Sequence, residues 1–119
     1  MKHTDARGEI EDLLVNEVGA VTRVTFKAGA VRGNHFHNQT TQSDTVISGT
    51  LLCCWQAERD FCCFPNERVL GAGDAISHKP GVAHAYKAMT DAVIWSVCIG
   101  PRKGEDYASD TFKLKEPLL

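Results

Sequence analysis

The stretch Arg32–Gly49, RGNHFHNQTTQSDTVISG, carries two histidines that are two residues apart, His35 and His37. Successive side chains of a β-strand point to opposite faces, so both imidazoles of an H-x-H pair lie on the same face. A second stretch, Gly73–His84 (GDAISHKPGVAH), adds a histidine after a Pro-Gly turn. We therefore expect one pocket to be formed by His35, His37, Gln42 and His84.

Short strands separated by turns extend on both sides of this stretch. Residues Val21–Ala28 alternate, with Thr22, Val24 and Phe26 on one face, as in a half-buried strand. Segment Gly8–Val18 fits either a helix or a strand. Further strands are expected at Asn34–His37, Ser43–Ser48, Thr50–Gln56, Phe61–Phe64, Glu67–Leu70, Ala83–Ala88 and Ala92–Cys98, the last two joined as a hairpin by Thr90-Asp91. Many short strands and almost no helix predict an all-β sandwich or barrel.

Glycines punctuate the first stretch. Gly29 and Gly33 lie on either side of Arg32 and mark turns, or positions where the backbone approaches another segment closely. Beyond Gly100 the sequence predicts a charged Gly/Pro loop and then a tail that packs against the rest of the protein.

Length and charge narrow the classes of partner. The 119 residues predict one domain over 1–119, with 13 basic and 15 acidic residues and a net charge of −2. No block of like charge is present, so we expect neither a nucleic acid nor a membrane as partner. The N-terminal residues MKHTDARGEIED have no apolar signal core, and we expect a cytoplasmic protein.

The five cysteines form two adjacent pairs, Cys53-Cys54 and Cys62-Cys63, with Cys98 alone. Neither pair has the spacing of a zinc knuckle, and an odd count in a reducing compartment argues against a disulfide framework. In each pair we expect one side chain to face inward and the other outward. They are interpreted as buried or half-buried small hydrophobic residues, with a redox-labile cluster on a hairpin as the alternative.

The two stretches together resemble the two sequence motifs of the cupin superfamily, G-x5-H-x-H-x4-E-x6-G and G-x5-P-x-G-x2-H. The first matches from Gly29 to Gly49, with Gln42 in place of the usual glutamate. The second matches over Gly73–His84, with Pro80 one position late. The resemblance implies a cupin jelly-roll barrel, a double-stranded β-helix. Cupins of this size commonly form dimers, which implies a homodimer here.

One branch of that superfamily is similar at further positions. Asp5-x-Arg7-Gly8, Arg32-Gly33-x-His35 and Asp106-Tyr107 resemble the sugar-nucleotide cupins, which include RmlC-like epimerases and 3,4-ketoisomerases that mostly work without a metal. This resemblance implies that His35 is a general base. The base's carboxylate partner would correspond to Asp91, the catalytic tyrosine to Tyr86, and a diphosphate would be held by Arg32.

A metal site is the other interpretation of the same pocket. His35, His37, Gln42 and His84 would bind a divalent first-row transition metal such as Fe, Mn, Ni or Zn. An amide cannot act as a base, so proton transfer would need another group, for which Asp44 and Tyr86 are candidates. Arg32 and His78 would contact the substrate, with His78 either in the pocket wall or at the surface.

Three functions follow from these interpretations. The first is a metal-binding cupin that acts as an isomerase, lyase or dioxygenase on an anionic small molecule. The second is a metal-free sugar-nucleotide isomerase or epimerase that uses His35. The third is a non-catalytic cupin that binds a small ligand.

Overall fold

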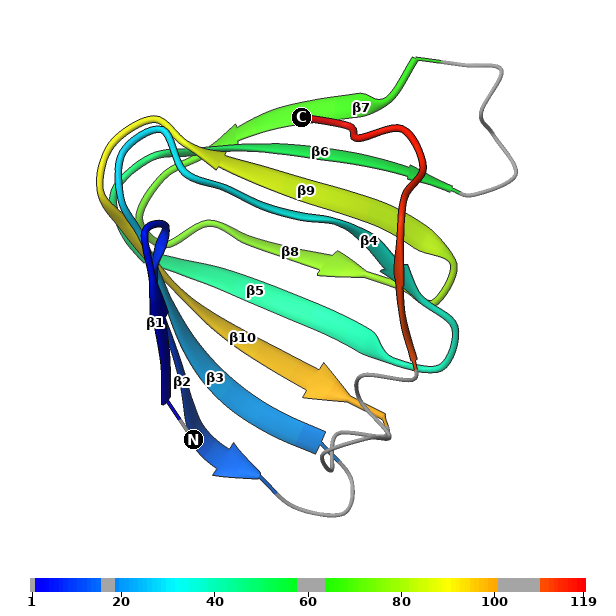
Figure 1. Cartoon of the computed structure of the whole chain (residues 1–119), viewed down its shortest axis with the longest axis horizontal. Coiled ribbons are helices and arrows are strands. Elements are labelled where there is room, and N and C mark those ends of the chain that lie inside the picture. Colours follow the sequence, from blue (N-terminus) through cyan, green and yellow to red (C-terminus); the bar gives the residue numbers. More distant parts are fainter. Residues whose placement is uncertain (1, 16–18, 58–63, 101–109) are drawn as a thin grey trace.

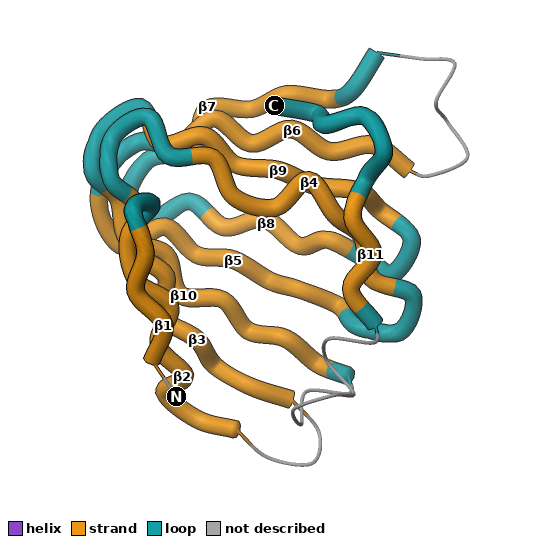
Figure 2. Tube along the Cα trace, viewed as in Figure 1, coloured by secondary structure: helices purple, strands orange, loops and turns teal. Residues whose placement is uncertain are grey.

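The computed structural model describes residues 2–15, 19–57, 64–100 and 110–119, and every regular element in these ranges is a β-strand. The strands form two antiparallel sheets that face each other (Figures 1 and 2). The six-stranded sheet has the order β1-β2-β3-β10-β5-β8, in which the strands are Lys2–Asp5 (β1), Gly8–Val15 (β2), Gly19–Phe26 (β3), Ala92–Ile99 (β10), Thr41–Ser48 (β5) and Ala75–His78 (β8). The five-stranded sheet has the order β11-β4-β9-β6-β7, in which they are Thr111–Lys113 (β11), Val31–His37 (β4), Val82–Ala88 (β9), Leu51–Ala57 (β6) and Asn66–Leu70 (β7).

The space between the sheets is apolar at one end. Alternate residues of β3 are buried, and Val24 lies beside Ile94, which lies beside Val46. This row crosses three neighbouring strands of the six-stranded sheet. Leu51 of the opposite sheet belongs to the same buried cluster. This apolar end is where the burial of hydrophobic surface stabilises the fold.

Farther along the same strands the interior becomes polar. The row two positions away pairs Thr22 with Ser96 and Ser96 with Asp44, and all three side chains are buried. Facing them from β9 are His84 and Tyr86, which are also buried. Polar groups in a protein interior are costly unless they are hydrogen-bonded or bind something, so this end is the candidate functional region.

A β-bulge in β4 decides which side chains enter the interior. Arg32 pairs with Tyr86, and His35 pairs with His84. On β4 the two paired positions are three residues apart, whereas on β9 they are only two apart. The extra residue is accommodated at Gly33 and Asn34, which have φ angles of 95° and 56°. In a regular strand residues three apart would face opposite ways. The bulge instead turns both Arg32 and His35 toward the interior.

The tail crosses the structure beside this bulge. Strand β11 pairs with β4, with Thr111 opposite His37. The Asn34 side chain then accepts hydrogen bonds from the backbone amides of Leu118, at 2.8 Å, and Leu119, at 3.2 Å. The expectation that the tail packs against the rest of the protein is confirmed.

Most of the expected strands are confirmed, and the ambiguous segment is the strand β2 over its described residues, Gly8–Val15. Strand β1 was not expected, and residues 61–63 of one expected strand lie outside the described residues. The expected hairpin at Thr90-Asp91 is wrong, because β9 and β10 belong to different sheets and do not pair. These two residues instead carry the chain from one sheet to the other.

The cysteines are buried where the structure describes them. Cys53 lies on the interior face of β6, opposite Tyr86, and Cys54 lies on the other face but is equally buried. Both are free cysteines, and burial raises the pKa of the Cys53 thiol to about 12. A thiol with so high a pKa forms little of the reactive thiolate, which favours the structural interpretation of Cys53. The Cys62-Cys63 pair lies outside the described residues.

The bulge predicts a specific response to a single methyl group. A Cβ at position 33 would lie 2.8 Å from the carbonyl oxygen of His84, whereas a Cβ at Gly29 would meet nothing within 4 Å. Both glycines have positive φ angles. We expect Gly29→Ala to lower the free energy of unfolding by about 1 kcal/mol, from φ strain alone, and Gly33→Ala by about 3 kcal/mol. Equal losses in chemical denaturation would show that the close approach to His84 does not matter.

Candidate functional site

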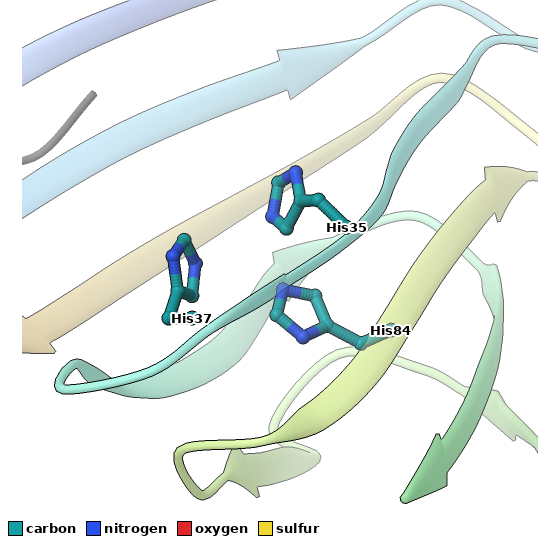
Figure 3. A group of neighbouring side chains, drawn as sticks. All are labelled: His35, His37 and His84. Atoms are coloured by element: carbon teal, nitrogen blue, oxygen red, sulfur yellow. The ribbon is translucent and has the colours of Figure 1, made fainter. Parts of the chain in front are cut away.

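Three histidines from the five-stranded sheet converge at the polar end of the interior. His35 and His37 lie on β4 and His84 on β9, and one ring nitrogen of each lies within 4.8 Å of the others (Figure 3). The ring centroid of His35 is 4.9 Å from that of His37 and 4.7 Å from that of His84. The spacing of the H-x-H pair and the register of β4 with β9 bring them together. The sequence-based grouping of these histidines is confirmed.

The hydrogen bonds of His84 fix which nitrogen faces the cluster. Its Nδ1 lies 3.2 Å from the carbonyl oxygen of Val82. A carbonyl only accepts, so Nδ1 carries the proton and Nε2 keeps a lone pair. This Nε2 is buried and has no hydrogen-bond partner among the described residues. A buried lone pair directed at two other imidazoles is what a metal ligand provides.

His37 also has a backbone carbonyl beside its Nδ1. Its Nδ1 lies 3.2 Å from the backbone carbonyl of Asp110, and its Nε2 lies 3.3 Å from Oε1 of Gln42. If Nδ1 donates to the carbonyl, then Nε2 and Oε1 face each other as two acceptors. A cation between them and the other two histidines would satisfy both acceptors.

A chain of buried polar side chains continues from Gln42. Its amide nitrogen donates to Oδ2 of Asp44 at 2.7 Å, and the hydroxyl of Tyr86 donates to the same oxygen. His78 Nε2 lies 2.8 Å from the Tyr86 oxygen. Because the tyrosine proton already points to Asp44, His78 must donate in this pair. Oδ1 of Asp44 and Nδ1 of His78 have no hydrogen-bond partner within the described ranges.

Burial keeps His35, His78 and His84 uncharged. It lowers the pKa of His35 from 6.5 to about 4, with smaller contributions from His37 and His78. Burial also lowers the pKa of His84 well below its usual value, reinforced by His78 and His35. The pKa of His78 is lowered mainly by burial as well. Neutral imidazoles are the form that binds metal ions.

Arg32 supplies a buried positive charge two positions along the strands from the cluster. Its side chain is 7% exposed, and its guanidinium carbon lies 5.6 Å from the ring centroid of Phe26. In the part of the chain that the structure describes, Nε and Nη2 find no hydrogen-bond partner. Its nearest carboxylate is Asp5, with 3.7 Å between Oδ1 and Nη2. A buried guanidinium with unused donors is suited to binding an anion.

The other expected site residues divide into two groups. Gln42, Asp44 and Tyr86 lie next to the histidines, as described above. His78 is buried rather than on the surface, and its ring stacks on that of His84 at 4.3 Å between centroids and 11° between planes. Asp91 does not reach the site. It lies beyond the far end of β9, where Oδ1 accepts a hydrogen bond from the backbone of Ala28 at 2.8 Å.

Asp110 is a residue of the site that the sequence did not reveal. Its carboxylate accepts hydrogen bonds from the backbone amides of Asn38, Gln39 and Thr40, and from the Thr40 hydroxyl. It therefore fixes the turn between His37 and Gln42, while its own carbonyl orients His37. The polar residues between His37 and Gln42 indicate a tight turn, and the backbone amides of such a turn need a hydrogen-bond acceptor. Nothing in the sequence says which carboxylate supplies it.

Comparison with family models finds none that matches this sequence, and no curated protein matches it. Solved structures do resemble it. The capsular polysaccharide assembling protein CapF from Staphylococcus aureus gives a TM-score of 0.81 at 18% identity, over 98% of this chain and 32% of that chain. Bacillus subtilis oxalate decarboxylase, which has Mn(II) centres, gives 0.78 at 19% identity, over 96% and 30%. An RmlC-like cupin from Shewanella frigidimarina gives 0.71 at 19% identity, over 88% and 86%.

These similarities establish the fold. The chain has the cupin jelly roll, so the fold expected from the two motifs is confirmed. The chain spans about a third of the length of the CapF and decarboxylase chains. The cluster of three histidines fits a metal-binding cupin. The described part of the chain contains no helix that is long and apolar enough to span a membrane.

The lowered pKa of His35 predicts how stability depends on pH. The unfolded chain binds this proton near pH 6.5 and the folded protein only near pH 4, so the free energy of unfolding falls as the pH drops through that window. For metal-free protein we expect His35 alone to contribute on the order of 3 kcal/mol to this fall. Denaturant titrations of wild type and His35→Gln at several pH values measure it.

The exposed His3 provides the matched control. His3→Gln should leave the pH dependence of unfolding unchanged, whereas His35→Gln should make it shallower and leave the part that His78 and His84 contribute. If His35→Gln and wild type lose stability in parallel between pH 6.5 and 4, the pKa of His35 is not lowered in the folded protein.

Proposed function

We propose that this protein is an enzyme that uses a divalent first-row transition metal to act on a small anionic molecule. The metal ligands in this proposal are His35, His37, Gln42 and His84. The observation that carries it is the buried Nε2 of His84, whose lone pair has no partner among the described residues. The likeness to a decarboxylase with Mn(II) centres supports a divalent ion. Fe, Mn, Ni and Zn all suit this set of ligands.

Three neutral imidazoles and an amide give a site without a negatively charged ligand. A bound divalent ion would supply Lewis acidity, which polarises a carbonyl or hydroxyl group of the substrate. Because none of the four ligands neutralises the ion, this site favours anionic or enolate-forming substrates. We therefore favour isomerase or lyase chemistry, in which a proton leaves a carbon next to a carbonyl group.

Proton transfer is assigned to Asp44 and Tyr86. The Tyr86 hydroxyl donates to Asp44, and burial together with the neighbouring Asp44 raises the pKa of Tyr86 well above its usual value. Tyr86 is therefore protonated at neutral pH, and its oxygen is in contact with His78 at 2.8 Å. The pair holds one transferable proton between a phenol and a carboxylate. His78 lines the wall beside it.

Arg32 is assigned to the anionic group of the substrate. It lies on the same strand and faces the same interior as His35, beyond the bulge. A carboxylate or phosphate bound by Nε and Nη2 would satisfy the two donors that have no partner in the described structure. A substrate held there would extend toward the histidines.

The metal-free alternative receives less support. A base at His35 needs a group that orients its ring, and no hydrogen bond to the His35 ring occurs among the described residues. With a pKa of about 4, His35 would also be a weak base at neutral pH. A dioxygenase would use the same ligands, and oxygen consumption with substrate would identify it. Retained ligand binding without turnover would identify a non-catalytic cupin.

We also propose a homodimer that works in the cytoplasm. The outer face of β10 exposes large apolar side chains, with Trp95 45%, Val97 37% and Ile99 52% exposed. A second copy covering this face would remove them from water. The free cysteines Cys53 and Cys54 support a reducing compartment.

Metal content is the direct test of the proposed function. Protein purified without chelator or an affinity-column metal should contain close to one equivalent of a first-row metal by elemental analysis. His84→Ala should lose it, because the variant removes one imidazole ligand, while His3→Ala should retain it. Wild-type protein that stays metal-free after incubation with Mn(II), Fe(II), Ni(II) and Zn(II) would refute the metal site.

The anion site has a separate test in metal-free protein. Phosphate or malonate should raise the melting temperature of wild type in a concentration-dependent way, and Arg32→Met should abolish this shift. Without the anion, Arg32→Met should be no less stable than wild type, since it removes a buried charge that lacks full pairing. An unchanged anion-dependent shift in the variant would remove Arg32 from the substrate site.

A further inference from the structure

We infer that Asp44 is a positioning residue that turns the Gln42 side chain so that its oxygen faces the histidines. This inference rests on the proposed metal site. Gln42 and Asp44 are two residues apart on β5 and share its interior face, where they are 8% and 1% exposed. The Gln42 amide nitrogen donates to Asp44 Oδ2 at 2.7 Å, and Oε1 lies 3.3 Å from His37 Nε2.

An amide has two ends of similar shape, and only one of them can bind a cation. Its oxygen has lone pairs, whereas its NH2 group only donates. A glutamate at this position would present an oxygen either way, but a glutamine needs a neighbour that selects one orientation. The carboxylate oxygen of Asp44 can only accept a hydrogen bond, so it pairs with the NH2 group of Gln42 and repels the amide oxygen. Asp44 therefore determines that the oxygen points toward the cluster.

Asp44 is itself held in place. The Tyr86 hydroxyl donates to the same Oδ2 as Gln42 does, and Tyr86 is in turn contacted by His78. On the two neighbouring strands the residues paired with Asp44 are Ser96 and Ile76. With one oxygen shared by two donors, rotation of the carboxylate would break both contacts. The orientation of the Gln42 amide is thus fixed by Asp44 and Tyr86, which are not among the proposed ligands.

Asp44 also places a negative charge next to the proposed ligand Gln42. With an amide in place of the motif's glutamate, the four proposed ligands carry no negative charge. The carboxylate of Asp44 is one hydrogen bond away, and it polarises the amide so that the oxygen becomes a better donor of electron density. Positioning and charge make different predictions, so substitutions at Asp44 can separate them.

Two variants of similar size isolate the orientation. Asp44→Asn keeps an oxygen that can accept from both Gln42 and Tyr86, while Asp44→Leu removes the acceptor. We expect Co(II) affinity, titrated by its visible absorption, to fall less than about threefold in Asp44→Asn and about tenfold to a hundredfold in Asp44→Leu. Similar losses in both variants would mean that charge, and not orientation, is the contribution of Asp44, and would overturn the inference.

A second substitution, at Gln42, distinguishes orientation of the amide from general support of the fold. Gln42→Glu presents an oxygen whichever way the side chain turns, so it should raise Co(II) affinity more in the Asp44→Leu background than in the Asp44→Asn background, where only the added charge acts. An equal gain in the two backgrounds would mean that Asp44 does not orient the Gln42 amide. Circular dichroism checks folding, and Asp44→Ala replaces Asp44→Leu if the latter does not fold.

A metal-free measurement separates this inference from the proposed function. In the nitrogen-15 NMR spectrum of the metal-free protein, the Gln42 side-chain amide protons should exchange slowly in wild type and Asp44→Asn, and quickly in Asp44→Leu. If wild type shows this pattern but binds no metal, the metal site falls and the positioning stands. If the Gln42 amide protons exchange equally slowly in Asp44→Leu, Asp44 does not hold the amide and the inference is overturned.

Discussion

The site depends on burying imidazoles while keeping them neutral. His78 and His84 are each 2% exposed or less, and burial lowers the pKa of both imidazoles. A neutral imidazole has one donor nitrogen, and in this interior the donors of His84 and His78 are directed at Val82 and Tyr86. The remaining nitrogens keep lone pairs in a region with few groups that can donate to them. Because donors are scarce, these lone pairs would be available to a cation. Without one, they lower the stability of the folded chain.

The surrounding fold is arranged around that region. The bulge at Gly33 and Asn34 turns Arg32 toward the same interior as the histidines, and the Asn34 side chain accepts a hydrogen bond from the tail. Asp110 fixes the turn after His37, and β11 pairs with the edge of β4. Two of the four proposed ligands and the proposed anion site lie on β4, and the supporting turn follows it, so a shift of β4 would disturb them together.

The sequence predicted what depends on local spacing. Two-residue periodicity placed His35 and His37 on one face, and the paired motifs added His84 and the cupin fold. Alternation alone would have sent Arg32 to the face opposite His35, because the bulge that brings them together is a non-local fit to the backbone of His84. Likewise, the Thr90-Asp91 hairpin failed because neighbours in sequence can belong to different sheets. Asp110 and the Asn34 contact join segments that only the folded chain brings together.

The contact between His37 and Asp110 spans 73 residues of sequence. During synthesis the chain therefore leaves the ribosome with His35 and His37 long before it has the carbonyl that orients one of them. Over that interval these histidines lack the neighbours that bury them in the folded protein. The carbonyl that orients His37 is in place only after β11 has docked on β4. In the proposed metal site, the selection of an ion would therefore depend on the folded barrel and not on the emerging segment.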